Sequence, residues 1–158
     1  MGQHVDRRLF LLGIAALPAT LTASPGAAQA RRVWSVDEAF DALLNDTARV
    51  VDVRTRDEWR ETGVGAGIWP ISMHEPDFAR RLFRARELAE GRQVGLICAT
   101  GGRSGSVIRA LRQAGYDTGF ADISEGMLGS GSGPGWIAAG LPVTPMDSAL
   151  ASLPQELA

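Results

Sequence analysis

The chain has 158 residues, 45% of them apolar and 22% charged, which is about the length and composition of one globular domain. Its 16 basic residues, all of them arginine, nearly balance its 18 acidic residues and are spread along the chain. This balance argues against a nucleic-acid-binding protein, because binding to phosphates requires a basic patch, so we expect no nucleic-acid partner.

Residues 1–30 have the features of an export signal and not of a folded segment. Arg7 and Arg8 precede a short apolar stretch, Leu11–Leu17, in the manner of a twin-arginine signal, and a small-x-small cleavage site ends at Ala30. The apolar stretch is shorter than the about 20 residues that span a bilayer. We therefore predict cleavage after Ala30 and a soluble periplasmic protein without stable membrane association. The alternative is a frayed amphipathic start on a cytosolic protein.

Two helix starts have capping-box spacing, in which a Ser or Thr and a later Glu satisfy each other's backbone N–H groups. Ser35–Glu38 predicts the start of one helix, and Thr55–Glu58 predicts a short helix over Arg56–Thr62 that ends at Gly63. Between them, Val50–Val53 has the apolar run of a buried strand, which we predict to be the first strand. The apolar stripe of the first helix consists of Val36, Phe40, Leu43 and Leu44.

Strands and helices continue to alternate along the chain. Ile68–Ile71 is a candidate short strand, and apolar residues at helical spacing over Pro76–Ala89 predict a helix that ends before Gly91. Val94–Cys98 is an uncharged run typical of a central parallel strand, and the helix that follows it is closed by Gly115. This alternation predicts an α/β domain of three layers, in which helices flank a central, mainly parallel sheet.

Cys98 is the only cysteine, so it cannot form a disulfide within the chain. It stands at the carboxyl end of the predicted central strand, where open α/β sheets bind their ligands. The loop that leads from it into the next helix consists of Ala99, Thr100, Gly101, Gly102 and Arg103. The glycines allow successive backbone N–H groups to converge, and Arg103 adds a positive charge, so the loop is expected to bind an anion.

The chemistry expected of this loop is nucleophilic. A helix N-terminus and a guanidinium stabilise a thiolate, and attack by the Cys98 thiolate on a sulfane sulfur would leave a persulfide that the N–H groups could hold. This reaction needs no general base and no cofactor. It needs no metal, and His74 is the only histidine after residue 30, so we expect no metal site. A buried, inert cysteine is the structural alternative.

Segments along most of the chain resemble the rhodanese family, in the family's order and spacing. The matching positions are Val51, Asp52, Val53, Arg54, Glu58, Trp59 and Gly63 in a strand and helix, Cys98, Gly101, Arg103 and Ser104 in the active-site loop, and Gly115, Tyr116, Glu125, Gly126, Met127, Trp136, Ala139, Gly140, Leu141, Pro142 and Val143 in the closing segments. The resemblance covers about Val33–Thr144. It implies one rhodanese-like domain over residues 31–146, followed by a short C-terminal tail over residues 147–158.

The resemblance also implies a sulfurtransferase. Such a protein moves sulfane sulfur from a small donor, thiosulfate or a persulfide, to a thiophilic acceptor such as a thiol or cyanide. Cys98 would carry the persulfide, the amides from Ala99 to Arg103 would line its pocket, and Arg103 would assist anion binding. Ser104 would support the loop.

Asp52 and Arg54 match residues that brace the active-site loop in rhodanese-like domains. The alternative for this pair is an ordinary polar strand end with a surface ion pair. Trp59, Trp69 and Trp136 are expected to belong to the hydrophobic core, because large aromatic side chains dominate the energetics of burial.

Three features of the chain depart from the family pattern, the first being Val64–Ile68, where the family often has a His-Ile-Pro-Gly-Ala-like stretch. Ala99 and Thr100 are uncharged, whereas members that use thiosulfate often have a basic residue in the loop, so we expect thiosulfate to be a poor donor. The segment Leu128–Gly135 is a Gly/Ser-rich insertion, for which we predict a mobile loop and not a regular element.

Two other functions stay open at this stage. A phosphatase or arsenate reductase of the same architecture has a longer loop between cysteine and arginine, large enough to surround a phosphate, whereas only four residues separate Cys98 from Arg103. A non-catalytic sulfur carrier or binding module would exchange sulfur with one periplasmic thiol protein and would show little activity on small donors.

Overall fold

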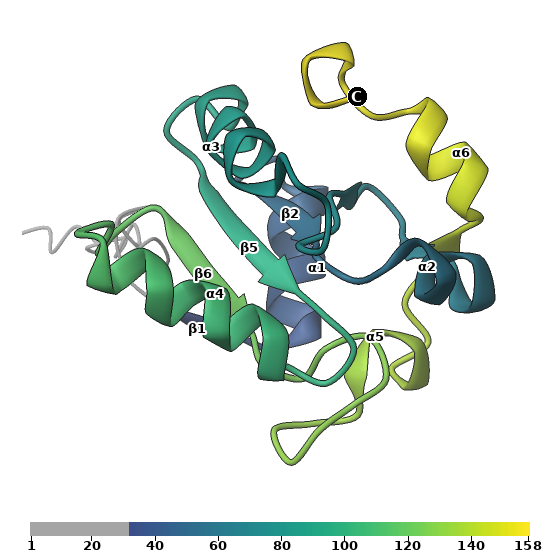
Figure 1. The fold of residues 1–158 in the computed structure, drawn as a ribbon. Helices are drawn as coiled ribbons and strands as arrows, with labels where there is room; N and C mark the ends of the chain where they lie inside the picture. The colour runs from purple at the N-terminus through teal and green to yellow at the C-terminus, as the bar shows by residue number, and fades with distance from the viewer. Residues whose placement is uncertain (1–31) are drawn as a thin grey trace, which may run out of the picture.

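The computed structural model describes residues 32–158, and the predicted export signal over residues 1–30 lies outside them. A five-stranded sheet, all of whose strand pairs are parallel, runs through this part of the chain (Figure 1). Its strand order is β1 (Val33–Trp34), β6 (Phe120–Ile123), β5 (Gln93–Ile97), β2 (Ala48–Asp52), β4 (Trp69–Pro70). A separate antiparallel pair consists of β3 (Val64–Gly65) and β7 (Val143–Thr144). Strand β5 is therefore the central strand of the sheet.

Helices cover both faces of the five-stranded sheet, which confirms the predicted three-layer α/β architecture. The helices on one face are α1 (Val36–Leu44), α2 (Arg56–Thr62), α5 (Gly135–Ala138) and α6 (Met146–Ala151). Those on the other face are α3 (Phe78–Leu88), α4 (Gly102–Gln113) and the 3₁₀ helix η2 (Gln155–Leu157). Among residues 32–158 no helix is long and apolar enough to cross a membrane.

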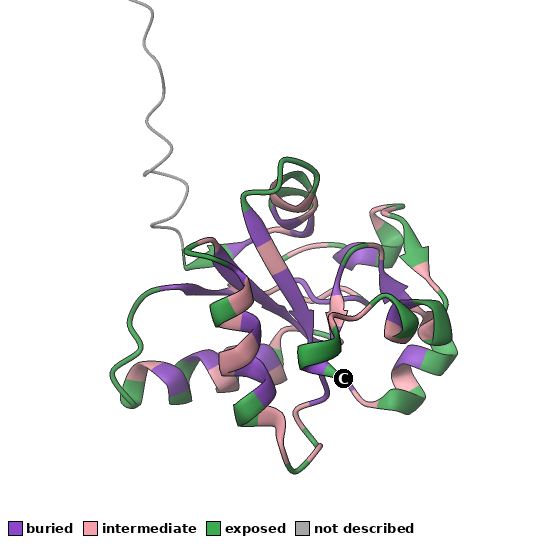
Figure 2. Ribbon diagram, turned by 90° about the horizontal axis from the view of Figure 1, so that it is seen from above, coloured by how far each residue is buried: buried purple, intermediate pink, exposed green. Residues whose placement is uncertain are grey.

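Each face of the sheet has its own hydrophobic core. Successive strand side chains point to opposite faces, so Val50 packs in the core beneath α1 and Val51 in the core beneath α3 and α4. Figure 2 shows the buried residues along the central strands and the exposed ones on the outer turns of the helices. Trp59 and Trp136 are fully buried in the α1-side core, as expected, whereas Trp69 is only partly buried at the β4 edge.

Both predicted capping boxes are present. In each, the Ser35 or Thr55 hydroxyl accepts from the backbone N–H of the Glu three residues later, and that Glu accepts from the backbone N–H of the capping residue. Helix α2 ends before Gly63, whose φ of 76° lies in the left-handed region that suits glycine. The predicted short helix over Arg56–Thr62 is therefore confirmed with its boundaries.

The structure corrects several predicted boundaries. Val50–Val53 is not the first strand, because β1 precedes it and pairs with β6, and a two-residue strand carries no readable sequence period. Strand β5 ends at Ile97, so Cys98 is the first residue beyond it. Helix α3 begins at Phe78 and not at Pro76. Leu44, predicted to be in the apolar stripe of this helix, is the last residue of α1 and is 68% exposed. Ala39, which was not predicted to be in the stripe, is buried.

The segment over residues 147–158, predicted as a short tail, packs onto the domain. It supplies most of α6 and all of η2. Leu157 is fully buried in the core beneath α3 and α4, and Arg81 Nε donates to the Leu157 carbonyl oxygen at 2.7 Å. This end of the chain therefore closes the hydrophobic core and is part of the folded body.

Leu157→Ala should lower the free energy of unfolding by about 2–5 kcal/mol, because it removes buried methyl groups and leaves a cavity. Urea unfolding of the purified protein measures this change. Leu44→Ala, which truncates an exposed leucine, is the matched control and should change stability by less than about 0.5 kcal/mol. Equal effects of the two substitutions would show that the C-terminal segment does not stabilise the core.

Candidate functional site

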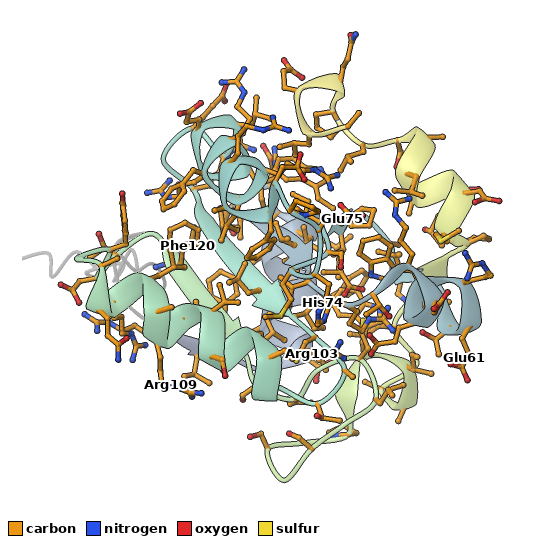
Figure 3. The ribbon with its side chains drawn as sticks, in the orientation of Figure 1. Glu61, His74, Glu75, Arg103, Arg109 and Phe120 are labelled. Atoms are coloured by element: carbon orange, nitrogen blue, oxygen red, sulfur yellow. The ribbon has the colours of Figure 1, made fainter. Side chains whose placement is uncertain are left out.

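Cys98 lies at the carboxyl end of β5, where the loop to α4 begins. Its side chain is only 1% exposed. Gly101 is the N-cap of α4 and has a left-handed φ of 83°, which turns the chain sharply from the strand into the helix. Figure 3 shows Arg103 in the first turn of α4, beyond the tip of β5. The predicted order of strand, tight loop and helix is therefore present.

The loop rests directly on the segment that follows β6. The Met127 N–H donates to the Cys98 carbonyl oxygen and the Leu128 N–H to the Ala99 carbonyl oxygen, both at 2.8 Å. A Cβ at Gly126 would lie 2.3 Å from the Ala99 oxygen, and a Cβ at Gly101 would lie 2.2 Å from the carbonyl oxygen of residue 124. The contact between the two segments is therefore possible only with glycine at both positions.

This contact leaves the N–H groups of the loop unpaired. Within the described part of the chain, the amides of Ala99, Thr100, Gly101, Gly102 and Arg103 donate to no protein acceptor. The last two are among the first N–H groups of α4, which have no partner inside the helix. The carbonyls of Cys98 and Ala99 accept hydrogen bonds from the segment after β6. The N–H groups of the loop are therefore available to an anion on the opposite side of the loop.

Ser104 lies beneath the loop, next to the thiol. Its side chain is fully buried, and its hydroxyl is 3.5 Å from Cys98 Sγ and 3.2 Å from the Gly101 carbonyl oxygen. A hydroxyl at this distance from the sulfur can donate a hydrogen bond to a thiolate.

Arg103 is held by a residue that the sequence analysis did not assign to the site. Its Nη1 donates to Glu58 Oε2 at 2.7 Å, and its Nη2 donates to Glu58 Oε1, so the pair is bidentate. Hydrogen bonding to Arg103 is the main cause that lowers the pKa of Glu58 to about 2. Glu58 in turn raises the pKa of Arg103, to which the charges of Cys98 and Asp52 also contribute. From the sequence, Glu58 was placed in a capping box and among the positions that match the family's strand and helix, but it was given no role in the site.

Asp52 and Arg54 form a fully buried ion pair, which rules out the surface ion pair considered for them. Arg54 Nη2 donates to Asp52 Oδ2 at 2.8 Å and to the Gly63 carbonyl oxygen at 2.7 Å, and Nη1 donates to the Thr62 hydroxyl at 2.7 Å. These contacts tie the end of β2 to the end of α2 and do not reach the Cys98 loop. The pair therefore joins β2 to α2, and α2 carries Glu58, the partner of Arg103.

The remaining polar residues near the site do not form a metal centre. Within residues 32–158, no group of three or more His, Cys, Asp or Glu side chains could hold a metal ion. His74 is exposed in the loop that follows β4 (Figure 3), where its backbone N–H donates to the Ser72 hydroxyl.

The segment over Leu128–Gly135 is held in place by hydrogen bonds. Ser130 and Gly133 form an isolated antiparallel bridge, and the Ser130 hydroxyl donates to the carbonyl oxygen of residue 124 at 2.9 Å. The Gly135 N–H donates to the buried Glu125 carboxylate at 3.2 Å. This Gly/Ser-rich segment is therefore anchored to the residues that carry the Cys98 loop.

The rhodanese-like domain family matches residues 36–129, which is more than half of the chain, and the protein therefore belongs to the rhodanese family. This range includes Cys98 and its loop, and also Glu58. No curated protein matches the chain.

Solved structures support the same fold. The polysulfide-sulfur transferase homodimer from Wolinella succinogenes is 22% identical, covering 76% of this chain and 83% of that chain, with a TM-score of 0.54. Rv0390 from M. tuberculosis is 25% identical, covering 72% and 96%, with a TM-score of 0.53. A protein of unknown function from Rhodopseudomonas palustris, described as a possible tyrosine phosphatase, is 21% identical, covering 82% and 100%, with a TM-score of 0.52.

Arg54→Ala should lower the free energy of unfolding by about 3–5 kcal/mol, because it leaves the Asp52 carboxylate buried without its counter-charge. Denaturant unfolding near pH 7 measures the change. Arg60→Ala removes an exposed ion pair with Asp57 and should cost less than about 1 kcal/mol. A small effect at both positions would contradict a bracing role for the buried pair.

Glu58→Gln should reduce stability by about 1 kcal/mol near neutral pH, a value discounted for the partial exposure of the pair. Gln keeps the capping box but loses the charge. Because the folded pKa of Glu58 is lowered from 4.5 to about 2, its contribution is present above pH 4.5 and is lost as pH falls toward 2. Unfolding of both proteins across this range should show the gap closing, whereas a constant gap would contradict the ion-pair contribution.

Proposed function

We propose that this protein is a sulfurtransferase in which Cys98 carries sulfane sulfur as a persulfide. The observation that supports this best is the cradle of loop N–H groups: the amides from Ala99 to Arg103 have no protein acceptor among the described residues, and they follow directly on a cysteine at the end of the central strand. A terminal persulfide sulfur is a small anion of the kind such a cradle stabilises.

The proposed cycle has two displacements. The Cys98 thiolate attacks the outer sulfur of the donor, an S–S bond to Cys98 forms, and the donor's own S–S bond breaks with its electron pair leaving on the donor thiolate. An acceptor thiolate or cyanide then attacks the terminal sulfur, and Cys98 leaves as a thiolate. The loop N–H groups stabilise the negative terminal sulfur between the two steps.

The charge distribution favours a persulfide or polysulfide donor over thiosulfate. Arg103 is the only charged residue in the loop, and its charge is balanced by the bidentate contact with Glu58. Ala99 and Thr100 add no charge, so the loop offers no unpaired cation to a sulfonate group. The same contact weighs against a phosphatase, since Arg103 is already engaged and the loop from Cys98 is short.

We further propose that the protein is exported, with cleavage after Ala30, and works in the periplasm on a small sulfur donor and a thiol acceptor. No nucleic acid and no stable membrane association are part of this proposal. The basis is the twin-arginine pattern in residues 1–30. Cys98 has no disulfide partner within the chain and would therefore stay available in an oxidising compartment.

A sulfur carrier that serves one periplasmic thiol protein is the second candidate. Two exposed apolar side chains on the segment that contacts the loop favour it: Leu128, whose N–H binds the Ala99 carbonyl, is 54% exposed, and Ile137, whose N–H binds the Met127 carbonyl, is 40% exposed. Exposed apolar side chains beside a reactive group suit a protein partner more than a small polar acceptor.

Incubation of the mature protein with a low-molecular-weight persulfide should add one sulfur, about 32 Da, that cyanide removes, because cyanide attacks the terminal sulfur of a persulfide. Intact mass spectrometry of protein recovered from the periplasm measures the loading and also shows whether the chain begins at Arg31. Loading from thiosulfate should be slower.

The control for this experiment is Cys98→Ser, which should gain no sulfur from any donor. Loading of Cys98 with slow discharge to every small thiol and fast discharge to a periplasmic thiol protein would favour the carrier. Absence of loading from persulfide, polysulfide and thiosulfate alike would overturn sulfur transfer from small donors.

A further inference from the structure

The Glu58 carboxylate joins two helices at the edge of the site. Its Oε2 accepts from the Thr55 backbone N–H at 3.0 Å and from the Thr55 hydroxyl at 2.9 Å, which fixes it at the start of α2. The same oxygen accepts from Arg103 Nη1 at 2.7 Å, and Oε1 accepts from Arg103 Nη2. A carboxylate fixed on α2 therefore determines where the guanidinium of α4 lies.

This ion pair is partly open to solvent. The side chains of Arg103 and Glu58 are 30% and 26% exposed, in contrast to the fully buried pair of Asp52 and Arg54. Partly exposed ion pairs contribute little to stability, because water and salt screen the two charges. The larger consequence of the pair is therefore local, since it decides which charge and which free N–H donors the start of α4 presents.

Arg103 lies close to any anion that the loop binds. Its backbone N–H is one of the loop donors without a protein acceptor among the described residues. An anion at that N–H is separated from the guanidinium by no more than one side-chain length, which is within the about 8–10 Å over which charges interact in salt solution. A free guanidinium binds oxyanions through two parallel N–H groups, but both terminal nitrogens of Arg103 donate to Glu58.

Glu58 is the acidic residue of α2 that reaches the loop. Asp57 pairs instead with Arg60 on its own helix, and Glu61 is exposed. Figure 3 shows Glu61 at the outer end of α2, away from Arg103. The helix therefore contains a matched position, Glu61, at which the same loss of charge leaves the pair intact.

We propose that Glu58 is a specificity-determining residue, which keeps Arg103 from binding the sulfonate group of a donor such as thiosulfate. The proposal rests on the proposed function and names the residue that restricts its donors. In loading from thiosulfate, the Cys98 thiolate bonds to the outer sulfur while the donor's S–S bond breaks and sulfite leaves with the electron pair. Arg103 can bind the sulfonate only when Glu58 does not hold it.

The first test measures the charge at the thiol without sulfur transfer. Cys98 is alkylated near neutral pH with neutral iodoacetamide and with anionic iodoacetate, which are nearly equal in size, and intact mass gives both rates. The ratio of the iodoacetate rate to the iodoacetamide rate cancels changes in the thiolate fraction, because the thiolate attacks both reagents. Glu58→Gln should raise this ratio about 3- to 10-fold, the effect of one unpaired charge at this range, and high salt should reduce the gain.

Three matched variants show whether the charge acts through the pair. Glu61→Gln removes the same charge from the same helix and should leave the ratio within about 2-fold of the wild type. Arg103→Gln leaves Glu58 without its partner and should lower the ratio about 3- to 10-fold. The double variant Glu58→Gln/Arg103→Gln has no charge at either position, so its ratio should stay within about 2-fold of the wild type. It has no unpaired charge to destabilise the fold and decides the question if Glu58→Gln alone folds poorly.

Sulfur loading then tests the donor itself. Glu58→Gln should load from thiosulfate about 3- to 10-fold faster than the wild type, because the freed guanidinium can bind the sulfonate. Loading from a low-molecular-weight persulfide whose organic part is uncharged should change less than about 2-fold, and Glu61→Gln should change neither rate. Intact mass measures both.

The proposal is overturned if Glu58→Gln gives the alkylation ratio of Glu61→Gln, or if it loads from persulfide but gains nothing with thiosulfate. A double variant whose ratio falls as far as that of Arg103→Gln would also overturn it, since Arg103 would then bind anions despite its contact with Glu58. The predicted ratios without loading from any donor would remove the sulfurtransferase proposal and leave the charge balance by Glu58 intact. Loading from persulfide without those ratios would do the reverse. A Cys98 that neither reagent alkylates and no donor loads would overturn both.

Discussion

The approach of two backbone segments determines the shape of the site. The loop after Cys98 lies on the segment after β6 so closely that neither Gly101 nor Gly126 has room for a side chain. The carbonyls of Cys98 and Ala99 are bound by N–H groups from that segment. Since a peptide directs its N–H and C=O to opposite sides, the loop's own N–H groups are left for a ligand. The free N–H groups at the start of the loop thus follow from what its carbonyls contact.

A second set of contacts links a buried ion pair to a partly exposed one at the site. The buried pair of Asp52 and Arg54 joins β2 to the end of α2, and α2 presents Glu58 to Arg103 at the start of α4. Each acidic group has an arginine partner at close range, which offsets the cost of removing the charges from water. Arg103 is consequently held in one orientation, and Glu58 balances its charge. A site that binds a doubly charged anion such as phosphate would need an arginine that is free to pair with it. Asp122 stands apart from this set, because its Oδ1 is buried without a hydrogen-bond partner among the described residues and burial raises its pKa.

Local sequence signals were accurate where the structure is local. Ser35 with Glu38 and Thr55 with Glu58 marked two helix starts, because a capping box is satisfied within a few residues. Contacts between segments that are distant in the sequence could not be predicted from such local patterns. Strand β1 exists only because it pairs with β6, and Leu157 is buried only because the end of the chain returns to α3. A two-residue strand and a single leucine are too short to show a hydrophobic period, so neither contact could be predicted from the sequence.

The sequence by itself determined the α/β architecture, the rhodanese resemblance and the place of Cys98 at the mouth of a glycine-containing loop, because strand runs, caps and turns depend on neighbouring residues. Only the tertiary structure decided which groups surround the thiol. Glu58 lies 45 residues from Arg103 in the chain, and the pairing of β5 with β6 brings the Asp122 carboxylate next to Gly105 in the first turn of α4. Such contacts join side chains from separate elements, and their partners are selected by packing and by the need to pair buried charges, which no single segment encodes.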